Sequence, residues 1–83
     1  MIMKYRADVE IYSNYTIDKK TVDIYPVENG YIINFTDDGF IFVQPYDADN
    51  SNDMYKAIEQ VFFDNMEYFN KEESATINVK NLY

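Results

Sequence analysis

The first part of the chain alternates between apolar and polar positions, which is typical of a strand with one buried face. Over residues 5–17 the odd-numbered positions are mostly apolar, and the even-numbered positions are mostly polar or charged. This pattern predicts a half-buried strand, with Ser13 and Asn14 as the point where it is interrupted.

The segment YPVENGYIINFTDDGFIFVQPY, residues 25–46, predicts two consecutive β-hairpins. Asn29-Gly30 and Asp38-Gly39 are favoured in two-residue hairpin turns, because Gly, Asn and Asp accept a positive φ. With such a loop at both sites, Phe35 opposes Ile24 on one side and Phe42 on the other. The face assigned to the core then carries Val22, Ile24, Ile33, Phe35, Phe40 and Phe42. The opposite face carries Tyr25, Val27, Ile32, Ile41 and Val43.

Residues 52–70 have the apolar period of an amphipathic helix. The apolar arc of this helix contains Met54, Ile58, Val61, Phe62, Tyr68 and Phe69. Asn65 falls within the arc and needs a hydrogen-bond partner there, whereas Phe63 falls toward the polar side. Ile77 and Val79 alternate with polar residues and predict a last short strand.

These elements predict a single α+β domain spanning residues 1–83, in the order β-β-β-β-α-β. The expected architecture is an antiparallel sheet of four to five strands with one amphipathic helix. No segment is long and apolar enough for a signal peptide or a membrane span. We therefore expect a cytoplasmic protein that does not contact a membrane.

Composition argues against most catalytic chemistry. The sequence has no His and no Cys, so it lacks the usual base near neutral pH, a thiol nucleophile and a thiolate metal ligand. Its two glycines both lie at predicted turns and cannot form a phosphate-binding glycine loop. We expect a protein that is not an enzyme and that holds no cofactor and no metal.

The formal net charge is −8, and the charge is unevenly placed. No Lys or Arg occurs between Thr21 and Tyr55. The acids in this window are Asp23, Glu28, Asp37, Asp38, Asp47, Asp49 and Asp53. Such a surface repels nucleic acid and favours cationic partners.

The stretch DADNSND, residues 47–53, has three interpretations. As a calcium loop it has acids at alternating positions, but Asn52 and Ile58 stand where an EF-hand requires Gly and Glu. As the entry to a helix, it places Asp49 and Asp53 near the positive end of the helix dipole, which stabilises acids by about 0.3–1 kcal/mol each. As an imitation of phosphates, it spaces Asp47 and Asp49 about 6.6–6.8 Å apart on an extended chain.

Aromatic residues are too numerous for a small core. The chain has nine Tyr and six Phe, and we expect Tyr12, Tyr25, Tyr46 and Phe63 to be partly exposed. Surface Tyr is enriched at protein interfaces. The alternative is that Tyr occupies solvent-facing strand positions because of its high β propensity.

The whole chain resembles small phage-encoded inhibitors, including anti-CRISPR proteins and uracil-DNA glycosylase inhibitors. The resemblance lies in the size, the acidity, the lack of His and Cys, the hairpins ENGY and DDGF, the acidic helix NDMYKAIEQVFFDNMEYFNKEE and the closing strand. It rests on this composition and plan and not on a diagnostic motif. It implies a protein that occupies the nucleic-acid site of a host defence or repair protein.

We therefore predict an inhibitor that imitates nucleic acid and binds the basic cleft of a bacterial defence nuclease, such as a CRISPR effector. It is not expected to bind nucleic acid itself. The predicted contact residues are Asp37, Asp38, Asp47, Asp49, Asp53, Asp64 and Glu67, with Tyr46 and Phe63. The alternative is a non-enzymatic interaction module that forms a homodimer through the sheet face bearing Ile41 and Val43.

Overall fold

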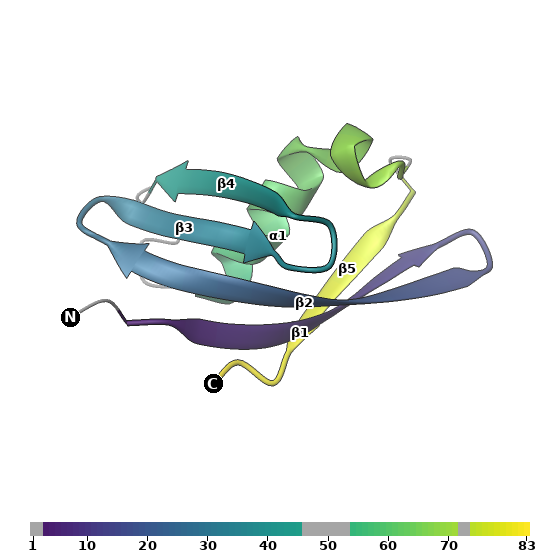
Figure 1. Cartoon of the computed structure of the whole chain (residues 1–83). Helices are drawn as coiled ribbons and strands as arrows, with labels where there is room; N and C mark the ends of the chain where they lie inside the picture. Colours follow the sequence, from purple (N-terminus) through teal and green to yellow (C-terminus); the bar gives the residue numbers. More distant parts are fainter. Residues whose placement is uncertain (1–2, 46–53, 72–73) are drawn as a thin grey trace.

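Five antiparallel strands form one sheet in the order β4-β3-β2-β1-β5 in the computed structural model, which describes residues 3–45, 54–71 and 74–83 (Figure 1). The strands are β1 (Tyr5–Ser13), β2 (Thr16–Val27), β3 (Gly30–Phe35), β4 (Phe40–Pro45) and β5 (Thr76–Lys80). Helix α1 (Met54–Asp64) and the 3₁₀ helix η1 (Met66–Phe69) lie between β4 and β5 in the chain and across one face of the sheet (Figure 1). The predicted α+β class and element order are confirmed.

The first hairpin turns earlier than the alternation predicted. Strand β1 ends at Ser13, and the chain reverses through Asn14 and Tyr15, with Asn14 at φ 52°. The predicted interruption is confirmed, but the run to residue 17 is two strands and not one. The turn resets the alternation, so that Ile17 pairs with Tyr12 and is exposed.

The two later hairpins have a register two residues away from the predicted one. Ile33 faces Ile24 on β2 and Phe42 on β4. Gly30 lies in β3 and not in the turn. A side chain is excluded there because a Cβ would come within 2.3 Å of the Gln44 carbonyl oxygen. A shift by two residues leaves the side chains on the same face, so the predicted core face is retained.

The core lies between this sheet face and α1. Its sheet side includes Val22, Ile24, Ile33 and Phe35, all fully buried, with Phe40 and Phe42 packed against them. Its helical side includes Ala57, Ile58, Val61 and Phe62. The core residues predicted for β2, β3, β4 and α1 are confirmed.

The predicted helix over 52–70 is interrupted at Asn65. Its side-chain amide donates a hydrogen bond to the Val61 carbonyl oxygen, 2.9 Å away, and this is the partner that its place in the apolar arc requires. The tighter turn of η1 changes the direction of the next side chains. Phe69 enters the core as predicted, but Tyr68 is 55% exposed. No helix in the described ranges is long and apolar enough to cross a membrane.

Candidate functional site

The predicted contact residues fall into two groups. Tyr46, Asp47, Asp49 and Asp53 lie outside the described residues, and so does the interpretation of DADNSND. Asp37 and Asp38 lie in the loop between β3 and β4, while Phe63, Asp64 and Glu67 lie at the end of α1 and in η1.

The two loop carboxylates are bound to β2. Asp37 accepts a hydrogen bond from the Thr21 backbone N–H through Oδ2 at 2.8 Å. Asp38 forms an ion pair with Lys20 at 2.8 Å. These contacts join residues 16 and 18 positions apart in sequence, and local sequence patterns carry no information on them. These two acids fix the loop against the sheet, and part of their charge is compensated there.

The acids at the end of the helical layer lie at the surface. Asp64 and Glu67 are exposed, and the Gln60 side-chain amide donates a hydrogen bond to Asp64 Oδ1 at 2.7 Å. Phe63 is 45% exposed, and its ring makes a T-shaped contact with the ring of Phe62. Exposed carboxylates and an exposed ring therefore occur together on this side, as the sequence predicts.

The sheet and its rim hold most of the basic residues in ion pairs. These pairs are Arg6–Asp23, Lys20–Asp38, Lys71–Asp18 and Lys80–Glu10. Arg6 binds both carboxylate oxygens of Asp23, at 2.8 and 3.2 Å, and Asp23 is 6% exposed. The hydrogen bond from Arg6 lowers the pKa of the Asp23 carboxyl below its ordinary value, against the opposite effect of burial.

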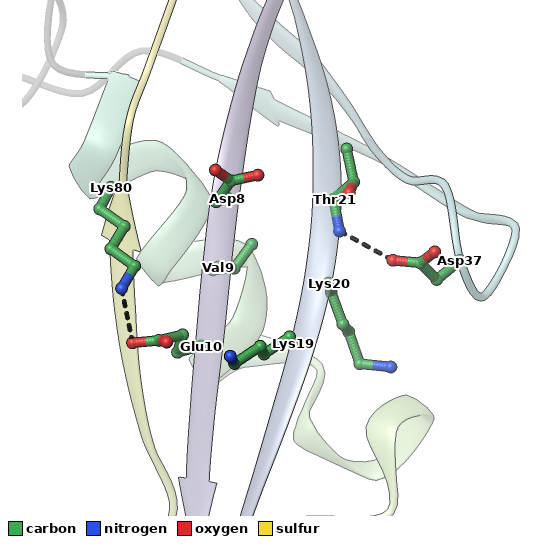
Figure 2. A pocket seen from close by; sticks show the side chains of 8 residues that line it. All are labelled: Asp8, Val9, Glu10, Lys19, Lys20, Thr21, Asp37 and Lys80. Carbon is green, nitrogen blue, oxygen red and sulfur yellow. Dashed lines mark hydrogen bonds and ion pairs between the residues drawn. The ribbon is translucent and has the colours of Figure 1, made fainter.

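A depression of about 340 Å³ crosses β1, β2 and β5, and its lining residues appear in Figure 2. They are Asp8, Val9, Glu10, Lys19, Lys20, Thr21, Asp37 and Lys80. Glu10 accepts hydrogen bonds from the Tyr12 hydroxyl at 2.7 Å and is paired with Lys80 at 3.0 Å. These two bonds lower the pKa of Glu10. Both acids and lysines line this depression. It therefore lacks the cluster of like charges that would bind an anion or a cation.

Metal-ligating side chains are not grouped in the described part of the chain. No three His, Cys, Asp or Glu residues within it are arranged to hold a metal ion. The acids of the sheet instead face basic partners, as Glu10 does with Lys80.

A second depression, of about 330 Å³, lies beside β4. Its lining residues are Gly39, Phe40, Ile41, Phe42, Asn65 and Tyr68. The Tyr68 ring meets Phe40 and Phe42 edge-on, with ring centroids 5.8 and 5.9 Å apart. Three predicted acids, Asp38, Asp64 and Glu67, each adjoin a lining residue in sequence. The depression therefore lies between β4 and the residues that follow α1.

Tyr68 is a surface residue that sequence reasoning missed. Its position in the arc of a continuous helix places it in the core, and only the break at Asn65 turns it outward. In the sequence, the polar residue Asn65 within the apolar arc was the indication that the α-helix ends there.

The sheet face that α1 does not cover has an apolar region over β2, β3 and β4. Tyr25, Ile32 and Val43 form a cross-strand row. Val43 and Ile41 are 72% and 66% exposed. The predicted division of the hairpins into a core face and an outer face is confirmed, and the outer face is apolar at its β4 end.

No family model matches this chain, and no curated protein or solved structure matches it significantly. The resemblance to phage-encoded inhibitors stays a prediction from the sequence.

Proposed function

We propose that this chain is a non-enzymatic, anti-CRISPR-like inhibitor that occupies the basic nucleic-acid-binding surface of a bacterial defence nuclease. One observation carries the proposal: several bases of this acidic chain are already paired with its own acids, whereas Asp64 and Glu67 stay exposed. On the sheet, bases such as Arg6 and Lys80 are engaged by acids of the same chain. At the end of the helical layer, Asp64 and Glu67 are exposed beside exposed aromatic rings.

Exposed carboxylates of this kind can replace phosphates in a basic cleft. They accept charge-assisted hydrogen bonds from Arg and Lys, the groups that otherwise hold a nucleic-acid backbone. Their field accelerates the encounter with a basic protein. Phe63 and Tyr68 add apolar area and faces on which a guanidinium group can stack.

In this proposal the loop acids have another role than the exposed acids of the helical layer. Asp37 and Asp38 are bound to β2, so they contribute to the negative field and hold the loop more than they contact a partner. Asp64 and Glu67, with Phe63, are the proposed direct contacts among the described residues. Asp47, Asp49, Asp53 and Tyr46 stay proposed contacts on the basis of the sequence.

Affinity capture with matched variants tests this proposal. The immobilised parent chain, a Glu67→Lys variant and a Glu28→Lys variant are exposed to a bacterial lysate freed of nucleic acid. Glu28 is also an exposed acid but lies in the loop between β2 and β3. Both variants replace Glu with Lys and therefore change the net charge equally. The parent and Glu28→Lys should retain a nucleic-acid-binding protein that Glu67→Lys retains poorly. Equal retention by all three chains, or retention only of proteins that bind no nucleic acid, contradicts the proposal.

The apolar outer face supports a second candidate function, an interaction module that forms a homodimer. Ile41 and Val43 are largely exposed and continue into the row that contains Tyr25 and Ile32. A twofold axis through this face would bury the region against its own copy. Light scattering at two concentrations tests it, because the mass should rise toward that of a dimer and Val43→Asp should abolish the rise. A constant monomer mass rejects this candidate.

A further inference from the structure

Strand β4 is an edge strand that, among the residues the structure describes, has little of the usual protection against pairing. It is the last strand on its side of the sheet, and its sequence, FIFVQP, carries no charge. Natural edge strands are commonly blocked by Lys, by Pro, by a bulge or by a covering segment. Within the described ranges, Pro45 is the blocking residue on β4, and it stands at the end of the strand.

The pairing of β3 fixes which backbone groups of β4 face the open edge. Val27 and Gly30 close a two-residue loop and so form a hydrogen-bonded pair. In an antiparallel pair of strands every second residue pair is hydrogen-bonded. The bond from the Thr36 N–H to the Thr21 carbonyl oxygen, 3.0 Å long, fits this alternation. The β4 residues bonded to β3 are then Phe40, Phe42 and Gln44. The N–H and C=O groups of Ile41 and Val43 point away from β3 and toward the edge.

The depression beside β4 lies where one row of side chains of an added strand would project. Side chains of such a strand alternate between the two faces of the sheet. On the covered face they meet the depression lined by Phe40, Phe42 and Tyr68. On the uncovered face they meet Ile41 and Val43, which are exposed and apolar. Backbone bonds with side-chain pockets at alternate positions are the features by which sheet edges bind extended peptides.

Charge indicates what kind of segment fits. Asp64 and Glu67 are exposed and adjoin the lining residues Asn65 and Tyr68 in sequence, and the rings of Phe40 and Tyr68 offer faces to a cation. A Lys or Arg side chain therefore suits this position. A second copy of the chain suits it less, because each copy carries a net charge of −8 and like charges repel.

We propose that β4 binds an extended basic segment of the partner as a sixth strand of the sheet. A Lys or Arg of that segment enters the depression against Tyr68, and apolar side chains on its other face cover Ile41 and Val43. The basic character of the segment rests on the proposed function. Strand addition is the mode by which the chain would bind that partner.

Amide exchange with a designed probe tests the strand addition. The probe is the blocked heptapeptide TVRVRVT, which has Arg on one face and Val on the other, and the control peptide is TVEVEVT. Exchange of the Ile41 and Val43 amides, followed by NMR, should slow at least about tenfold with the Arg peptide, because these amides gain hydrogen bonds. The Phe42 amide, already bonded to β3, should change little. Absence of protection at Ile41 and Val43, or equal protection by both peptides, overturns the proposal.

A proline variant separates strand addition from the wider proposal. Val43→Pro removes an N–H at the open edge, where proline is tolerated, and Val43→Thr is the matched control that keeps it. The peptide should lose affinity for Val43→Pro and keep it for Val43→Thr, while equal binding to both overturns the inference. If Val43→Pro fails to fold, the exchange pattern of the parent chain decides.

Slow exchange at Ile41 and Val43 without peptide, together with a dimer mass, would instead assign the edge to a second copy. If capture of the partner is lost with Glu67→Lys but kept with Val43→Pro, the proposed function stands and strand addition fails.

Discussion

Replacing Phe35 with Ala removes a ring from the centre of the core. Phe35 is fully buried, and its ring centroid lies 4.8 Å from that of Phe69 and 6.3 Å from that of Phe42. Truncation of a buried Phe to Ala costs about 3–5 kcal/mol. The lost ring contacts, worth about 0.5–1.5 kcal/mol each, join β3 to η1 and to β4. We therefore expect a loss toward the upper part of this range.

Urea denaturation followed by circular dichroism measures this loss. A chain of 83 residues has a free energy of unfolding of about 4–12 kcal/mol, so the variant should lose a large fraction of its stability. With a urea dependence of about 1–2 kcal/mol per molar, the midpoint should fall by about 2 M or more.

The matched control for this measurement is Phe63→Ala. It makes the same chemical change at a ring that is 45% exposed, and it should cost less than about 1 kcal/mol. A loss below about 1 kcal/mol for Phe35→Ala, or equal losses for the two variants, would refute the assigned core face.

Three further predictions concern the backbone, an ion pair and a metal. Gly30→Ala should lower the free energy of unfolding by about 1–3 kcal/mol because its Cβ would meet the Gln44 carbonyl oxygen; a chemical-denaturation curve that matches the parent's contradicts this. Asp23→Asn should be less stable than the parent at neutral pH, because the lowered pKa of Asp23 stabilises the fold above its ordinary value of 3.8. This difference should shrink as the pH falls through the lowered pKa, and a difference that persists in thermal melts at still lower pH rules out the ion pair as its cause. Millimolar calcium should leave the melting temperature unchanged, because residues 47–58 lack the Gly and Glu of a calcium loop, and a saturable rise would show that a site exists.

The sequence predicted which faces are buried better than it predicted where the chain turns. The assignment of Ile24, Ile33 and Phe35 to the core survives because a register shift by two residues preserves the alternation. The exact places of the turns could not be predicted in the same way, since the loop between β2 and β3 keeps two residues but begins one residue earlier, and the loop between β3 and β4 has four. Gly30 is required by its contact with Gln44 on the next strand, and a local turn pattern carries no information on that contact.

The candidate site was predictable only in part. The helical period places Phe63, Asp64 and Glu67 at the surface, as the structure has them. The exposure of Tyr68 depends on the bond from Asn65 to the helix backbone and on the 3₁₀ turn that follows. Ion pairs such as Lys71–Asp18 join residues far apart in sequence, and only the folded sheet and helix bring them together.

Competition with nucleic acid tests the central claim most directly. The captured partner is loaded with fluorescently labelled nucleic acid of the kind that it binds, and the anisotropy is followed as the parent chain is added. The account predicts that the parent displaces the nucleic acid and that the Asp64→Lys, Glu67→Lys double variant does not, because the exposed carboxylates take the place of phosphates. Simultaneous binding, with the anisotropy unchanged while the parent chain saturates the partner, would contradict the account.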